Sequence, residues 1–184
     1  MTDAPAPRPA APELQTDRLI LRPHRIADYE DCCRLTSDPE AVRTIYRQPM
    51  SREDTWNRLL RFAGHWSLLG YGLLLVEERA SRRVIGEVGI ADFHRGLGED
   101  FDPWPEFAWM IASDVHGRGF ATEAAMAILA WMEANFAPEL LVCIIDPNNA
   151  PSLRVAEKLE FHPFGEVEYK DKPVLKMRRF APTR

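Results

Sequence analysis

A glycine-rich turn between an apolar strand-like run and a helix-like run carries the clearest chemical signal in this chain. The strand-like run covers 107–112 and the helix-like run covers 122–134, with Gly117 and Gly119 on either side of Arg118. Glycine has no Cβ, so the backbone can turn tightly and a ligand can approach its N–H groups. The first N–H groups of a helix have no partner inside it, and they suit a phosphate. The turn therefore predicts an anion site, to which Arg118 adds a charged donor.

Two common nucleotide-binding motifs do not fit this turn. A P-loop needs a glycine, four residues and then Gly-Lys-Ser/Thr, and the sequence contains no such run. A dinucleotide-binding fingerprint needs a third glycine where Thr122 stands. It also needs an acid at the end of the next strand, whereas Glu139 precedes that strand. A plain glycine turn without a ligand stays open as an alternative.

A second strand, cap and helix follow directly. Residues 140–145 are apolar on both faces, as in a fully buried strand, and a helical pattern covers 153–159. Asn149 is a good helix N-cap, and Pro151 is tolerated in a first helical turn. Two units of the same kind therefore lie next to each other in the chain.

Together these segments resemble the GNAT superfamily of acyl-CoA N-acyltransferases. The pyrophosphate loop of that family runs Gln/Arg-x-x-Gly-x-Gly/Ala, and residues 116–121 read His-Gly-Arg-Gly-Phe-Ala. Segments 14–23, 121–124 and 149–159 are similar to the RimJ/RimL branch. The resemblance covers about residues 13–180. Each motif alone would be a weak indication of the family, but the occurrence of three motifs in the family's order is specific.

The resemblance implies acetyl-CoA as co-substrate; the spacing of the histidines gives no reason to expect a metal. The pyrophosphate would be held by a loop of seven residues, namely His116, Gly117, Arg118, Gly119, Phe120, Ala121 and Thr122. The end of the fourth strand would bind the pantetheine arm through Trp109, Met110 and Ile111, with an N–H of Met110 or Ile111 serving the oxyanion. Asn149 and Ser152 would contact the cofactor, and Asn149 would also cap its helix.

The proton-transfer groups are less strongly indicated. Many relatives place a tyrosine where Ala156 stands, whereas the RimJ/RimL branch often assigns protonation of the thiolate to the serine at Ser152. A serine at this helical position also commonly bonds backbone. The first candidate for the base is Glu106, which precedes the fourth strand; its alternative is a carboxylate paired with an arginine. Further candidates for the base are Glu87 and then His94 and Asp92.

Composition narrows the class of protein. A chain of 184 residues fits one domain, 13–184, behind an Ala/Pro-rich tail at 1–12 that we expect to be flexible. The net charge of −5 argues against a nucleic-acid partner and mildly favours a cationic acceptor. No apolar run approaches the ~20 residues of a membrane span. Three cysteines without framework spacing favour a cytoplasmic protein, and the five histidines show no metal-ligand spacing.

The order of elements is strand, helices, three strands, helix, strand, helix and two strands, which predicts an α+β or mixed α/β fold. The GNAT resemblance implies a central, mostly antiparallel twisted sheet of about seven strands. The sheet is splayed between strands four and five and flanked by helices.

We therefore expect an N-acetyltransferase in which a primary amine, from a protein N-terminus or a small molecule, attacks acetyl-CoA directly. A catalytically silent acyl-CoA sensor and a nucleotide-binding domain are the alternatives. We expect a monomer or a homodimer. The loop 95–105 carries three acids and is either a solvated loop or a lip that attracts the amine.

Overall fold

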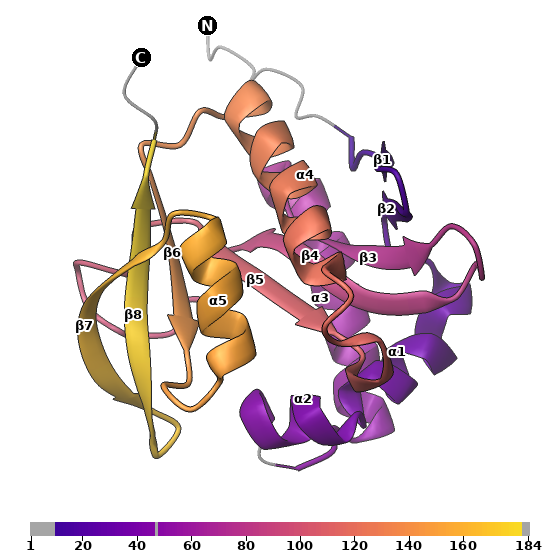
Figure 1. The fold of residues 1–184 in the computed structure, drawn as a ribbon, viewed down its shortest axis with the longest axis horizontal. Coiled ribbons are helices and arrows are strands. Elements are labelled where there is room, and N and C mark those ends of the chain that lie inside the picture. The colour runs from indigo at the N-terminus through magenta and orange to yellow at the C-terminus, as the bar shows by residue number, and fades with distance from the viewer. Residues whose placement is uncertain (1–9, 47, 182–184) are drawn as a thin grey trace, which may run out of the picture.

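An eight-stranded sheet with helices on both faces forms the protein (Figure 1). The computed structural model describes residues 10–46 and 48–181. The strand order is β1-β2-β3-β4-β5-β6-β8-β7, and only the β5–β6 pair is parallel. The strands are β1 (Leu14–Gln15), β2 (Leu19–Arg22), β3 (Leu73–Glu78), β4 (Val84–Ala91), β5 (Glu106–Ile111), β6 (Leu140–Ile145), β7 (His162–Tyr169) and β8 (Lys172–Phe180). The helices are η1 (Ile26–Asp28), α1 (Tyr29–Thr36), α2 (Pro39–Thr44), α3 (Arg52–Leu69), η2 (Ser113–Val115), α4 (Phe120–Asn135) and α5 (Ala150–Lys158).

The expected α+β fold and its mostly antiparallel sheet are confirmed. The sheet has eight strands where about seven were expected, because Leu14–Gln15 forms a two-residue strand against β2. Such a strand is too short to leave an alternating pattern in a sequence. Residues 1–9 of the expected tail lie outside the described part of the chain.

A wedge opens between β5 and β6, as the resemblance implied. The two strands have one register pair, Glu106 opposite Val142, and the Val142 N–H donates to the Pro105 carbonyl at 3.1 Å. Each strand continues on its outer side, β5 against β4 and β6 against β8. The carboxyl ends of β5 and β6 therefore diverge, and α2 lies across the open end (Figure 1).

Two helices cover opposite faces of the sheet near this wedge. α4 crosses one face and packs on β4 and β5, and α3 lies behind the sheet (Figure 1). The buried stripe of α4 includes Ile128 and the alanines Ala124 and Ala125, whose small side chains let the helix approach the sheet closely. α3 begins at the Ser51 cap, which accepts the Asp54 N–H at 3.0 Å.

The register of β4 and β5 decides which side chains face α3. Glu106 lies opposite Ala91, Ala108 opposite Gly89, and Met110 opposite Glu87, so these side chains share one face. Ala91 and Ala108 pack with Phe62 of α3, which identifies that face as the α3 side. Trp109 and Ile111 consequently face the α4 side.

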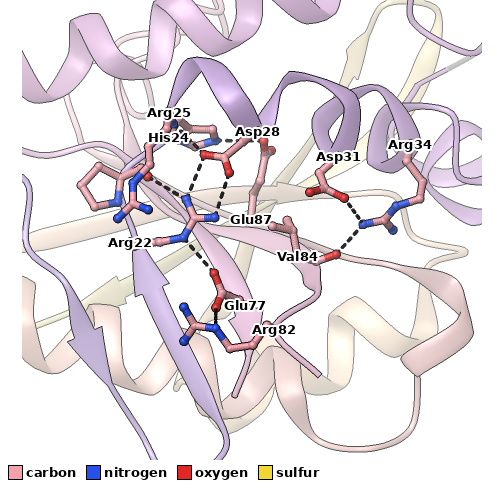
Figure 2. A network of polar contacts seen from close by, with 11 residues as sticks. Arg22, His24, Arg25, Asp28, Asp31, Arg34, Glu77, Arg82, Val84 and Glu87 are labelled. Carbon is pink, nitrogen blue, oxygen red and sulfur yellow. Dashed lines mark hydrogen bonds and ion pairs between the residues drawn. The ribbon is translucent and has the colours of Figure 1, made fainter. Parts of the chain in front are cut away.

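A network of ion pairs connects β2, η1 and β3 (Figure 2). Both carboxylate oxygens of Asp28 accept from the Arg22 guanidinium, at 2.8 and 2.9 Å, and Glu77 accepts its Nε at 3.0 Å. Arg82 pairs with the other Glu77 oxygen at 2.8 Å. Bonds to Asp28, partly offset by burial, raise the pKa of Arg22, so the cation persists and ties β2 to η1 and β3.

Candidate active site

A cavity of about 280 Å³ lies at the open end of the wedge. Its walls come from the end of β5, the glycine loop, and the first turns of α4 and α5, with α2 across the mouth. Of the residues expected to contact the cofactor, the cavity is lined by Trp109, Met110, Ile111, His116, Gly117, Gly119, Phe120, Ala121, Thr122, Asn149 and Ser152. The structure thus brings together segments that are far apart in sequence, and their binding roles stay predictions.

After the glycine loop, the first turn of α4 presents to this cavity backbone N–H groups that have no partner inside the helix. Gly117 and Gly119 have φ of 76° and 82°, in the left-handed region that disfavours side chains. Gly119 is the N-cap of α4, whose first backbone bond runs from the Glu123 N–H to the Gly119 carbonyl at 3.1 Å. The N–H groups of residues 120–122 precede that bond and are available to an anion.

The ladder between β4 and β5 directs the other backbone donors. The Ala112 N–H donates to the Ile85 carbonyl at 2.8 Å. In an antiparallel ladder every second residue of a strand bonds to the neighbouring strand in this way, and the residues between them turn their N–H groups away from it. Met110 therefore turns its N–H toward β4, whereas Trp109 and Ile111 turn theirs into the wedge. The Ile111 carbonyl lies 2.8 Å from His116 Nε2, on the same open edge. The register favours Ile111 over Met110 as a backbone donor to a ligand.

Asn149 and Ser152 line the opposite wall. The Asn149 side-chain oxygen accepts the Ser152 N–H at 3.1 Å, which confirms the cap expected for α5. This bond leaves the amide NH₂ of Asn149 free of partners among the described residues. The Ser152 hydroxyl, half-buried at the cavity, also forms no hydrogen bond within the described part of the chain, so backbone bonding does not occupy it.

The comparison with known proteins decides the family. The model of the acetyltransferase (GNAT) domain matches residues 18–162. The chain belongs to the GNAT acetyltransferase family. A GNAT-family acetyltransferase from Bordetella pertussis is 32% identical, with a TM-score of 0.84 over 91% of this chain and 99% of that one. The uncharacterized N-acetyltransferase p20 of Bacillus licheniformis is 24% identical over 83% of each chain.

Structures of the expected branch share the fold of this GNAT domain. The ribosomal L7/L12 alpha-N-protein acetyltransferase RimL, solved with coenzyme A, aligns with a TM-score of 0.71 over 90% of this chain and 96% of its own. At 14% identity this is a likeness of fold. In this GNAT domain, no helix of the described residues is long and apolar enough to cross a bilayer.

A polar clamp that the sequence analysis missed holds the glycine loop. The Glu123 carboxylate accepts from Thr16 Oγ1 at 2.5 Å, from the Arg18 N–H at 3.0 Å and from Arg18 Nε at 2.7 Å. Arg18 Nη1 also donates to the Arg118 carbonyl at 2.8 Å. Burial would raise the pKa of Glu123, but the bonds from Thr16 and Arg18 outweigh it and lower that pKa. The first turn of α4 is therefore tied to the segment between β1 and β2.

We expect Glu123→Gln to loosen this clamp. The variant loses a charge-assisted contact worth about 1–2 kcal/mol after screening at this partly exposed pair. A domain of this size then loses roughly 2–4 °C in Tm per kcal/mol. Because the folded-state pKa is lowered, the contribution is present above the unfolded pKa and is lost as the pH falls through the folded one. Thermal melts should therefore separate the two proteins at neutral pH and converge at acid pH, with Glu53→Gln as an exposed control. An equal gap at every pH would contradict the role of the charge.

The cavity is lined by two basic residues of α5, and not by Arg118, the cation that the sequence predicted. Arg118 pairs with Glu78 at 2.7 Å, lies over the Phe120 ring, and does not line the cavity. Arg154 and Lys158 of α5 do line it, and they form no ion pair with any described residue. Their spacing of four on a helix was the available signal.

Arg154 and Lys158 are expected to contribute to the binding of an anionic cofactor. Replacing both with glutamine should lower coenzyme A affinity by about tenfold and flatten its salt dependence, because two attractive charges are lost. Calorimetry at two salt concentrations measures this, with Arg178→Gln on β8 as the control. An unchanged salt slope would place both side chains outside the binding site.

Glu106, the first candidate for the base, lies outside the cavity lining on the α3 side. It is 4% exposed and sits where β5 and β6 begin to part. Arg95 donates to both carboxylate oxygens, at 2.6 and 2.8 Å, and also to the Tyr169 hydroxyl at 2.9 Å. Burial raises the pKa of Glu106, and the contacts from Arg95 oppose that rise. The arginine pair that was the alternative is present, and the role as base stays a prediction.

The other candidates for the base differ in their environments. Glu87 is buried in an ion pair with Arg58, and its second oxygen lies 3.1 Å from His24 Nε2. Burial would raise the pKa of Glu87, but Arg58 and His24 outweigh it and lower it to about 2. A carboxylate with so low a pKa is a poor base at neutral pH. His94 and Asp92 pair with each other at 3.2 Å, and the His94 side chain is exposed.

The Glu87 cluster also contains a third group that can bind metals. Donor atoms of His24, Cys32 and Glu87 lie within 4.8 Å of one another. Burial raises the pKa of the Cys32 thiol to about 12, and Arg58 already neutralises Glu87. These features favour an internal ion-pair cluster over a metal site.

The acids of loop 95–105 are largely used inside the protein. Asp100 pairs with Lys176 at 2.7 Å, and Asp102 accepts the N–H groups of Leu97 and Gly98 at 3.1 and 3.0 Å. Phe101 is 2% exposed in a cluster with Val142. The loop is therefore packed and internally bonded, which weakens its case as an acidic lip for the amine.

Proposed function

We propose that this GNAT domain transfers an acetyl group from acetyl-CoA to a primary amine. One observation carries the proposal: the cavity joins the free N–H groups of α4 to the open edge of β5 and to Asn149. An anion at the helix start and an extended arm along the strand match the two parts of coenzyme A. The solved coenzyme A complex of RimL supports the same cofactor.

In this proposal the backbone does most of the binding. The pyrophosphate lies against the N–H groups of residues 120–122, and the pantetheine arm runs along Trp109 and Ile111 as an added strand would. An N–H on this edge, which we assign to Ile111, stabilises the oxyanion of the tetrahedral intermediate. The free amide NH₂ of Asn149 donates a hydrogen bond to the cofactor arm, and His116 lines the cavity at the glycine loop.

Two side chains move protons in the proposed reaction. Glu106 accepts the proton of the attacking amine, directly or through water, on the α3 side of the sheet. Ser152 protonates the leaving thiolate at the cavity wall. A thiol with a pKa of about 8.5 leaves with modest help, so Ser152 contributes less than the base.

The acceptor is a protein N-terminal amine or a small-molecule amine. An α-amino group with a pKa of about 8 costs about 1.4 kcal/mol to neutralise at pH 7, whereas a lysine with a pKa of about 10.4 costs about 4.6 kcal/mol. A site with a single arginine-paired carboxylate as base is better matched to the weaker amine. The free thiols of Cys32, Cys33 and Cys143 agree with action in the cytoplasm, as a monomer or homodimer.

An acceptor screen tests the proposal. Protein, acetyl-CoA and a panel of amines are scored by released thiol and by product mass. Release that depends on an amine supports the transferase. Tight coenzyme A binding without release from any amine would make the domain an acyl-CoA sensor, and equally tight binding of free nucleotide would make it a nucleotide-binding domain.

A further inference from the structure

The side of the sheet that holds Glu106 also gathers three arginines. Arg58 and Arg61 project from α3, and Arg95 lies in the loop after β4. The Phe62 ring lies 4.4 Å from the Arg58 guanidinium carbon and 5.3 Å from that of Arg61. The Phe93 ring lies 5.5 Å from Arg61 and 4.4 Å from Arg95. Arg61 therefore stands between the other two cations, separated from each by one shared ring.

Two of these cations are neutralised and one is not. Arg58 pairs with Glu87, and Arg95 holds both oxygens of Glu106. Arg61 forms no hydrogen bond or ion pair with any residue in 10–46 or 48–181. Arg61 is exposed; partial desolvation lowers its pKa, and repulsion from Arg58 and Arg95 lowers it further. A cation next to like charges is stabilised by a bound anion.

The position of Arg61 relates this unmatched charge to the reaction. Arg61 shares the Phe93 ring with Arg95, and Arg95 positions Glu106, the proposed base. Apart from Met110, the cavity is lined on this side of the wedge by the α4-side residues Trp109 and Ile111 and by the starts of α4 and α5, so we assign the α3 side to the acceptor. An anion bound by Arg61 would therefore belong to the acceptor and would hold its amine near Glu106.

We propose that the acceptor amine carries a carboxylate and that Arg61 binds it. This inference rests on the proposed transferase function and names the substrate class of the same site. A guanidinium matches a carboxylate with two parallel N–H donors, which gives orientation as well as attraction. A ligand near these arginines is attracted by them despite the net charge of −5 on the whole protein, because charges beyond a Debye length of about 8 Å are screened. The carboxylate comes from a free amino acid or from an acidic side chain next to a peptide N-terminus.

Matched acceptors test the inference with the whole protein. Amino acids are compared with their carboxamides, and peptides with aspartate at the second position are compared with asparagine peptides. We expect kcat/KM to be about 10- to 100-fold higher for the carboxylate member, the ratio expected from one charge-assisted bond. The pair that shows the larger ratio identifies the source of the carboxylate. Equal rates for both members of every pair would overturn the inference.

Variants assign the preference to one side chain. Arg61→Gln should remove it by slowing the carboxylate acceptors while leaving the amides and the acetyl-CoA KM unchanged. Arg61→Lys should restore part of it. Arg178→Gln is the matched control, because Arg178 also lies over two rings, Phe164 and Phe180, on the far hairpin. An equal loss for carboxylates and amides in Arg61→Gln would assign Arg61 a structural role and contradict the inference.

A binding measurement separates this inference from the transferase proposal. Coenzyme A-loaded protein is titrated with an N-acetyl amino acid and with its amide. Absence of thiol release from all amines would defeat the transferase proposal. Tighter binding of the carboxylate, lost in Arg61→Gln, would still support the anion site, and equal binding of both ligands would contradict it.

Discussion

Replacing Gly119 with valine should abolish most coenzyme A binding while the protein stays folded. Gly119 has φ of 82°, a conformation that a β-branched residue avoids, so the loop must move away from its present shape. A Cβ there meets only the Arg18 guanidinium at 3.5 Å, so the fold itself has room. The N–H groups of α4 would lose their alignment on the phosphate. Calorimetry should show an affinity loss of at least about 100-fold, near 2.7 kcal/mol.

Two further variants calibrate this result. Gly64→Ala in α3 places a Cβ where nothing lies within 4 Å and should leave both stability and affinity intact. Gly119→Ala should give an intermediate loss, because alanine tolerates the left-handed region better than valine. Wild-type affinity in a folded Gly119→Val protein would remove the glycine loop from the cofactor site.

Glu106→Gln should lower turnover at neutral pH while coenzyme A affinity stays nearly constant. A general base contributes about 10²- to 10⁴-fold to a rate, and Glu106 does not line the cavity proposed to bind the cofactor. Part of the lost rate should return at high pH, where the amine is already neutral. The pH dependence of kcat and of kcat/KM measures both effects.

Arg95→Gln distinguishes a base from a structural carboxylate. Removing Arg95 keeps the carboxylate but lets burial raise the pKa of Glu106 further. The acid limb of kcat/KM should therefore move to higher pH, since the base must be ionised to work. A Glu106→Gln protein with the wild-type pH profile would show that Glu106 only anchors Arg95.

Local features of the site could be predicted from sequence because short segments fix them. The strand, the glycine turn and the helix start lie within one stretch of chain, and Gly119 and the Asn149 cap act on their own helices. The start of α4 was expected at Thr122 and lies at Phe120, because Gly119 itself caps the helix. Alternation along β5 also correctly placed Glu106 on the face opposite Trp109.

Contacts between distant segments could not be predicted in the same way. Glu123 and Arg18 are 105 positions apart, and only the folded sheet brings them together. The side chain of Arg118 pairs with Glu78, and no local sequence pattern predicts that contact. The grouping of Arg58, Arg61 and Arg95 depends on how α3 lies against β4. Sequence patterns therefore identified the residues that we propose for the cofactor, whereas the residues that we propose for the acceptor required the structure.

Transfer of a labelled acetyl group tests the central claim most directly. Protein is incubated with acetyl-CoA that carries a deuterated acetyl group and with the amine panel, and products are identified by mass spectrometry. We predict an amine product that carries the label, with release of one thiol per product and strong loss of both signals in Gly119→Val. Bound, intact acetyl-CoA with no labelled amine in any reaction would contradict the account.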